Sequence, residues 1–103
     1  MGKKTMKKSK SYKEHLFKRL QDPKEAASYL NAALEDEDSR VFLIALKDIA
    51  EAHGGIAKLA KETDLNRESL YKTLSARGNP RLQSLIAILQ ACNLDISIRP
   101  AAA

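Results

Sequence analysis

The sequence predicts an all-α fold of five helices followed by one short β-strand. Apolar residues recur at helical spacing in five segments, each bounded by residues that begin or end helices. Aromatic residues make up only 5% of the 103 residues, so the core must consist mainly of Leu, Ile and Ala, which suits helices. Residues 94–99 instead alternate between apolar and polar side chains, as a strand does.

The chain divides into a basic tail, one domain and a short C-terminal tail. Residues 1–12 are predicted to be disordered, because they are rich in lysine and hold almost nothing that could be buried. This tail could bind nucleic acid or a partner, or it could serve only to keep the protein in solution. Residues 13–100 are predicted to form a single helix-turn-helix domain with a modest core, and residues 101–103 a second tail.

The first predicted helix covers residues 23–34. Asp22 is a suitable N-cap, Pro23 occupies the first helical position, and Glu25 places a negative charge in the first turn. Residues 15–20, before this helix, fit either a helical turn or an extended lead-in.

Three further helices follow, separated by residues that interrupt helices. The acidic run 35–38 ends the first helix and favours the start of the next, over 39–53, because negative charge is stabilised at a helix N-terminus. Gly54-Gly55 then ends that helix. Two short helices are predicted over 56–63 and 67–75.

The last predicted helix covers residues 80–91. Asn79 is its expected N-cap and Pro80 its first helical residue, while Asn93 resembles a C-terminal cap. The strand over 94–99 follows.

A single strand cannot form a sheet, so this strand needs a partner. A homodimer or a strand supplied by another protein would provide one. The alternative is an extended tail that packs its apolar residues on the core: Leu94, Ile96 and Ile98.

Residues 56–75 have the pattern of a helix-turn-helix. The small Ala60 lets the second helix cross close to the first. Apolar residues hold both helices to the core: Leu59, Leu65, Leu70 and Leu74. One face of the second helix is then free to enter a DNA major groove. That face would carry Arg67, Glu68, Ser69, Tyr71 and Lys72. The motif predicts a DNA-binding protein and no enzyme.

Each side chain on this face has an alternative role. Arg67 could pair with guanine, hold a phosphate or remain a solvated surface residue. Ser69 and Lys72 could contact DNA or solvent, and Tyr71 could stack on a sugar, touch a thymine methyl or pack on its neighbours. Glu68 could accept a hydrogen bond from cytosine, but an ion pair with Lys72 is favoured.

The remaining candidate DNA contacts surround the second helix. Asn66 caps its start. Four residues around the rim are candidates for phosphate contacts: Lys58, Lys61, Arg77 and Asn79.

The charge of the chain is unevenly distributed around a net value of +5. Residues 1–20 hold eight basic residues and one acidic residue, residues 21–53 three basic and eight acidic, and residues 54–81 six basic and three acidic. The basic helix-turn-helix segment therefore suits a phosphate backbone. The acidic segment before it suits solvent or a basic partner protein.

No set of residues has the pattern of a catalytic or metal-binding site. His15 and His53 are far apart, with no Cys or second His at metal-ligand spacing. The acidic run 35–38 lacks the alternating ligands and central Gly of a Ca²⁺ loop, and Gly54-Gly55 is too short for a phosphate loop. We therefore expect no enzymatic activity, no cofactor and no metal.

The single Cys92 and the absence of long apolar runs bear on the compartment. Cys92 cannot form an internal disulfide and lies in an apolar run, so we expect it in the core. No stretch approaches the ~20 apolar residues of a membrane span, and the basic N-terminus lacks the apolar run of a signal peptide. We expect a cytoplasmic protein with no membrane partner.

Residues 22–100 resemble the addiction-module antidote proteins, antitoxins of HigA-like type with a helix-turn-helix of the Cro/C1 repressor class. The resemblance rests on LAKETDLNRESLYKTLS, on the GNP that follows, and on LDISIRP near the end. It implies a five-helix Cro/C1 repressor-like helix-turn-helix domain with a short C-terminal β-strand. Asp64 departs from the pattern, since many such proteins have Gly at this turn. The backbone there tends towards positive φ, which Asp tolerates better than most residues.

The resemblance implies an antitoxin of a type II toxin-antitoxin module. Such a protein is a sequence-specific repressor of its own operon and also neutralises a toxin by direct binding. The implied partners are operator double-stranded DNA, a RelE-type toxin and a second copy in a homodimer. Its two recognition helices would lie ~34–36 Å apart in successive major grooves. The toxin would contact the acidic segment 22–53 or the lysine tail.

Two other functions fit the same residues. One is a free-standing, phage-type transcriptional repressor with no toxin. The other is a protein-interaction module that does not bind DNA, which the basic residues Lys58, Lys61 and Lys72 disfavour.

Overall fold

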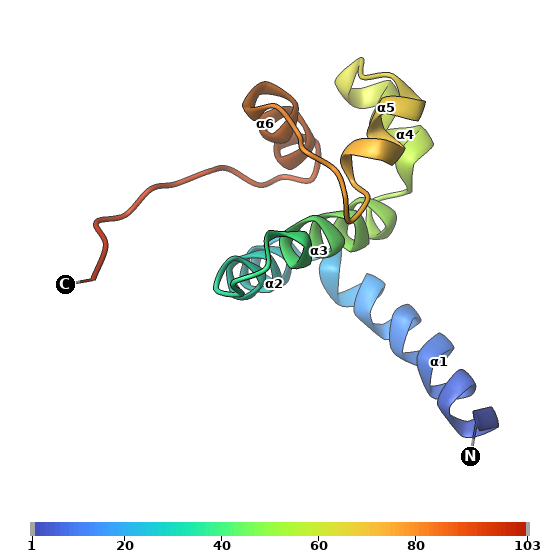
Figure 1. Cartoon of the computed structure of the whole chain (residues 1–103). Coiled ribbons are helices and arrows are strands. Elements are labelled where there is room, and N and C mark those ends of the chain that lie inside the picture. The colour runs from blue at the N-terminus through green and yellow to red at the C-terminus, as the bar shows by residue number, and fades with distance from the viewer. Residues whose placement is uncertain (1, 103) are drawn as a thin grey trace.

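The computed structural model describes the backbone of residues 2–102 and the side chains of residues 11–102. These residues form six α-helices: α1 (Gly2–Leu20), α2 (Pro23–Leu34), α3 (Ser39–Ala52), α4 (Ile56–Thr63), α5 (Arg67–Thr73) and α6 (Leu82–Ala91). Figure 1 shows α2 and α3 at the centre, with α4, α5 and α6 on one side and α1 projecting from the other. The all-α prediction is confirmed within this range.

Helix α1 is the one that the sequence did not predict. We expected disorder over residues 1–12, whereas the backbone is helical from Gly2; residue 1 lies outside the described residues. Lysine has a high helix propensity, which favours continuation of the helix along this segment. The C-terminal end of α1 is anchored by Leu16 and Leu20, which are buried against α2 and α3. The division of the chain into a tail and a domain remains a prediction.

Helices α2 and α3 begin at the predicted residues. Asp22 accepts a hydrogen bond from the backbone N–H of Lys24 at 3.0 Å, and Asp38 accepts one from that of Arg40 at 2.9 Å. Helix α3 ends at Ala52, one residue before the predicted end.

The end of α3 follows from two glycines. Gly54 and Gly55 have φ values of 110° and 92°, which residues with a side chain rarely adopt. The N–H of Gly55 donates to the Ala50 carbonyl at 3.0 Å, and that of Gly54 to the Glu51 carbonyl at 3.3 Å. These two bonds form a Schellman motif, which satisfies carbonyls that the helix leaves free.

Helices α2 and α3 form the central pair of the fold. Leu30 of α2 and Leu46 and Ile49 of α3 are buried in the common core. The Tyr29 hydroxyl donates a 2.8 Å hydrogen bond to Asp48 across the pair. Burial of the phenol and this hydrogen bond raise the pKa of Tyr29 well above its ordinary value, so the bond persists across the neutral range.

Helix α6 begins later than predicted. We expected Asn79 to cap a helix starting at Pro80, but α6 starts at Leu82 and Arg81 holds the N-cap position without a side-chain hydrogen bond. A residue before proline is disfavoured in a helix, which keeps Asn79 out of α6, and Arg81 also has extended backbone. At the other end Asn93 has φ 64°, and the Leu94 N–H donates to the Leu89 carbonyl at 2.8 Å. The prediction of Asn93 as a C-terminal cap is confirmed.

The predicted C-terminal strand is not formed in the described chain. Residues 94–99 are irregular, and no strand is present between residues 2 and 102 to pair with them. Leu94 is 8% exposed, Ile96 46% and Ile98 91%, so only the first packs on the core as a tail would. The segment leaves α6 as an extended chain (Figure 1), and residues 95–102 border hollows that they share with Asn31 and Leu34 of α2.

Candidate nucleic-acid interface

Helices α4 and α5 pack against each other and hold to the core through one apolar side. Ile56 and Leu59 of α4 are buried, as are Leu70 of α5 and Leu74 just after it. Ala60 and Leu65 are partly buried against the same core. The residues expected to position two short helices therefore do so.

The turn between the two helices has a defined geometry. The Thr63 hydroxyl donates to the Leu59 carbonyl at 2.7 Å and accepts from the Leu65 N–H at 3.3 Å. Asp64 ends α4 in the left-handed conformation, with φ 59° and ψ 18°. The expectation that this turn requires positive φ is confirmed.

Asn66 caps α5 as predicted. Its side-chain oxygen accepts hydrogen bonds from the N–H groups of Glu68, at 2.9 Å, and Ser69, at 3.1 Å. Because these two amides are occupied, contacts from this end of α5 depend mainly on its side chains.

All ten side chains predicted to contact DNA are solvent-exposed. They are Lys58, Lys61, Asn66, Arg67, Glu68, Ser69, Tyr71, Lys72, Arg77 and Asn79. Eight of them lie on α4, on α5 or at the N-cap of α5, while Arg77 and Asn79 lie in the link to α6. Exposure makes these side chains accessible, and their contacts with DNA remain a prediction.

The ion pairs differ from those expected. Among the described side chains Glu68 and Lys72 form no ion pair, whereas Lys58 and Glu62 approach to 3.6 Å on α4. An exposed pair of this kind contributes only about 0.3–0.5 kcal/mol, so Lys58 can exchange it for a phosphate.

The link after α5 approaches the helix closely at Gly78. A Cβ at this position would collide with the carbonyl of Thr73 and lie 2.8 Å from that of Lys72. The backbone of this turn therefore passes directly beneath the end of α5, which only glycine allows. This contact holds the link carrying Arg77 and Asn79 next to the helix.

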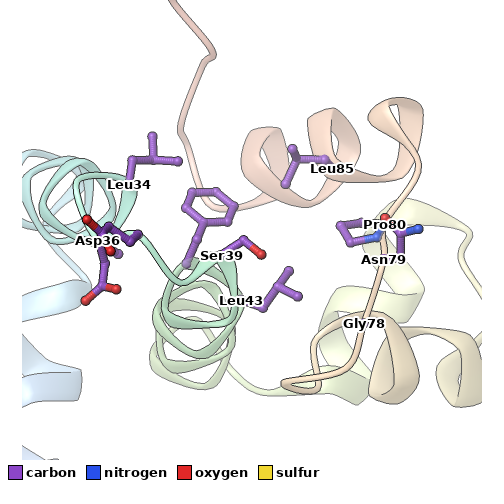
Figure 2. Close-up of a pocket in the computed structure, with 11 residues that line it drawn as sticks. Leu34, Asp36, Ser39, Leu43, Gly78, Asn79, Pro80 and Leu85 are labelled. Atoms are coloured by element: carbon purple, nitrogen blue, oxygen red, sulfur yellow. The ribbon is translucent and has the colours of Figure 1, made fainter.

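A hollow of about 320 Å³ lies on the other side of this link. Figure 2 shows Asn79 and Pro80 along one side, with Ser39, Leu43 and the acidic turn at Asp36 across from them. The hollow joins the acidic α2–α3 turn to the link beside α5.

Residues 11–100 match a family model described as "probable addiction module antidote protein". The chain belongs to this family of addiction module antidotes. The match covers most of the chain and includes the C-terminal part of α1, which lies before the residues that carried the resemblance. The predicted membership of the addiction-module antidotes is thus confirmed.

A relative of this antidote is known from Haemophilus influenzae. It is 34% identical over 80 residues, which make up 78% of this chain and 81% of the relative, and it is described as an uncharacterized protein. No solved structure matches the antidote.

Two further observations concern the described part of the antidote. No helix within residues 2–102 has the length and apolar character needed to cross a membrane. No group of three His, Cys, Asp or Glu residues in the same range is placed to hold a metal ion.

The hollow of Figure 2 is another feature of the antidote that the sequence did not predict. Its two sides, around Asp36 and Asn79, are some forty residues apart in the chain. No periodicity or capping signal links them, because only the tertiary fold brings them together.

Proposed function

We propose that this antidote is an antitoxin that represses its own operon by binding operator DNA, with α4 and α5 acting as a Cro/C1-type helix-turn-helix. It also neutralises a RelE-type toxin by direct binding. The observation that carries the proposal is the rigid mounting of α5: one side is buried in the core and the other presents polar side chains.

The spacing of residues on α5 supports this use of the helix. Arg67 and Tyr71 are one turn apart, as are Glu68 and Lys72, so the four side chains cover adjacent positions on the surface. Leu70 points into the core with 1% exposure. A helix mounted in this way can enter a major groove with its first residues against the base edges.

The surrounding charge supports a phosphate backbone as partner. Lys58 and Lys61 of α4 and Arg77 of the following link add positive charge on elements next to α5. DNA affinity from such residues depends strongly on salt, because each contact releases counterions.

The acidic segment 22–53 supports direct binding of a basic toxin. It holds eight acidic and three basic residues, and both α2 and α3 display part of it to solvent. Complementary charge would steer a basic toxin to this side and leave α5 to the DNA.

The first test is a gel-shift titration with the DNA directly upstream of the gene, beside an unrelated duplex of equal length. We expect tighter binding to the upstream DNA, by at least tenfold, and weaker binding as salt rises. Equal binding to both duplexes, or none at low salt, would contradict the repressor function.

Two variants with matched controls locate the interface. Arg67→Ala should weaken specific binding by about 1–3 kcal/mol, whereas Arg40→Ala, also in a first helical turn but on α3, should not.

Lys72→Ala should weaken binding to all duplexes and reduce the salt slope by about one, while Lys24→Ala on α2 should leave the slope unchanged. Equal effects of a variant and its control would exclude α5 as the reading helix.

Toxin binding is tested separately. The product of the adjacent gene should co-purify with the antidote and lose its toxicity in co-expression. DNA binding without such a partner would favour the free-standing repressor.

A further inference from the structure

We propose that residues 94–100 pair with the same residues of a second copy, as antiparallel strands centred on Ser97. The proposal rests on the proposed repressor function, for which the resemblance implies a homodimer, and identifies the surface that forms this dimer. The occupant of this surface is therefore another copy of the chain.

The backbone of this segment is available for strand pairing from Asp95 onward, because it forms no backbone hydrogen bonds within the described chain. Among the described residues, no backbone hydrogen bond involves Asp95 to Ala102. Ile96 is 46% exposed and Ile98 91%, and the segment leaves α6 as an extended chain (Figure 1) beside Asn31 and Leu34 of α2. Exposed backbone groups and apolar side chains on an extended segment favour addition of a strand.

The order of residues around Ser97 is complementary to itself. In an antiparallel pair centred there, Asp95 lies opposite Arg99 of the other copy, and Arg99 opposite its Asp95. Ile96 lies opposite Ile98 in the same way. Opposite charges and apolar pairs both stabilise facing positions, and like charges destabilise them.

Other registers lose this match. Centring the pair one residue away, on Ile96 or Ile98, separates both Asp95–Arg99 pairs. Centring it between two residues places an apolar side chain opposite a polar one, and a sheet with one buried face does not tolerate such a mismatch.

The backbone donors agree with the same register. The Leu94 N–H already donates to the Leu89 carbonyl, and Pro100 has no N–H. These two residues face each other when the pair is centred on Ser97, so they must occupy a pair without backbone hydrogen bonds. Because such pairs alternate with hydrogen-bonded ones, Asp95, Ser97 and Arg99 turn their backbone groups towards the second copy. Leu94 and Pro100, which have no free N–H, thus lie at positions that make no backbone hydrogen bond across the pair.

The apolar face of the pair meets a hollow of the body. Leu94 and Ile96 line a space of about 420 Å³ together with Leu34, Phe42 and Leu85. Leu34 is 62% exposed in one copy. Ile98 of the second copy would stand beside Ile96 on this face, and its burial there would add to the stability of the dimer.

Charge reversal tests the register through the oligomeric state, measured by sedimentation equilibrium without DNA. Asp95→Arg and Arg99→Asp each replace two attractive pairs by repulsive ones, so each should weaken the dimer about tenfold. The double variant restores both pairs with the charges exchanged and should dimerise within about threefold of the wild type. A double variant as weak as the singles would overturn the register.

Disulfide formation tests whether the strand pair is centred on Ser97. Ser97→Cys in a Cys92→Ala background places the two thiols across the symmetry axis, where Cα atoms ~5.5 Å apart suit a disulfide. Mild oxidation should then yield a covalent dimer. Ile44→Cys, exposed on α3 and absent from this surface, should remain monomeric on a denaturing gel.

The outcomes separate this proposal from the DNA-binding function. A dimer with the predicted cross-link and no DNA binding would contradict the repressor and leave the strand pair intact. DNA binding by a dimer that fails to cross-link at residue 97 would contradict only the strand pair. A chain that stays monomeric, or whose segment pairs only with a toxin, would also overturn it.

Discussion

Asp64 shows how a single residue meets a backbone requirement that usually calls for glycine. Its φ of 59° places it in the left-handed region, where residues other than glycine are strained. Short polar residues such as Asp tolerate this conformation best. The sharp turn between α4 and α5 is therefore compatible with this sequence at a small cost in stability.

Two substitutions at this position separate backbone strain from side-chain loss. Asp64→Val should lower the free energy of unfolding by at least ~1 kcal/mol, because a β-branched residue is strongly strained at positive φ. Asp64→Gly removes the strain and should not lower it. Urea denaturation measures both. Equal stability of the two variants would show that the turn relaxes to another conformation.

At the scale of the element, α5 is too short to be stable alone. It has seven residues, well below the ~12–15 that an isolated helix needs. Its stability comes from the buried Leu70 and from the Asn66 cap, which binds the N–H groups of Glu68 and Ser69. The cap thus links the stability of the domain to the proposed reading helix.

Substitution of Asn66 distinguishes its capping role from its proposed contact with DNA. Asn66→Ala should lower the free energy of unfolding by about 1 kcal/mol, because two amides lose their acceptor. Asn66→Asp keeps an acceptor and should retain the stability, yet weaken DNA binding by adding negative charge. Urea denaturation and gel shifts measure the two effects. Loss of stability in both variants would contradict the capping role.

At the scale of the whole molecule, Cys92 serves as a probe of the common core. It is fully buried just after α6, in the same apolar cluster as residues of every other helix. Burial, with a smaller contribution from the charge of Glu62, raises the pKa of the Cys92 thiol to about 11. The thiol is therefore neutral and inaccessible in the folded protein.

A thiol reagent at pH 8 should accordingly modify Cys92 only when the protein unfolds, with a rate that rises in urea.

The same burial makes the free energy of unfolding depend on pH. Below about pH 9 the thiol is protonated in both states, so it contributes no pH dependence. Between about pH 9 and 11 only the unfolded state loses the proton, so the free energy of unfolding should fall with rising pH.

The variant Cys92→Ala serves as the control for this dependence. Its stability should fall less than that of the wild type over the same pH range. Rapid modification of the folded wild type would show instead that α6 opens locally.

The sequence by itself determined features that depend on neighbouring residues. The bounds of α2 and α4, the caps at Asp22 and Asn66, and the positive φ at Asp64 agree with prediction. These features depend on hydrogen bonds and steric limits within a few residues, so local sequence contains the information. The exposure of the candidate DNA contacts on α4 and α5 also followed, since helical spacing assigns each residue to an inner or outer side.

Tertiary structure decided the features that depend on distant parts of the chain. The hollow between Asp36 and Asn79 arises where segments some forty residues apart in the sequence come together. Likewise, α1 is held in place by burial of Leu16 and Leu20 against α2 and α3. Residues 94–99 have the alternation of a strand but no partner within the described chain, because a strand is completed only by the backbone of another. Local sequence can favour such a strand, but only the arrangement of the chains in space can pair it.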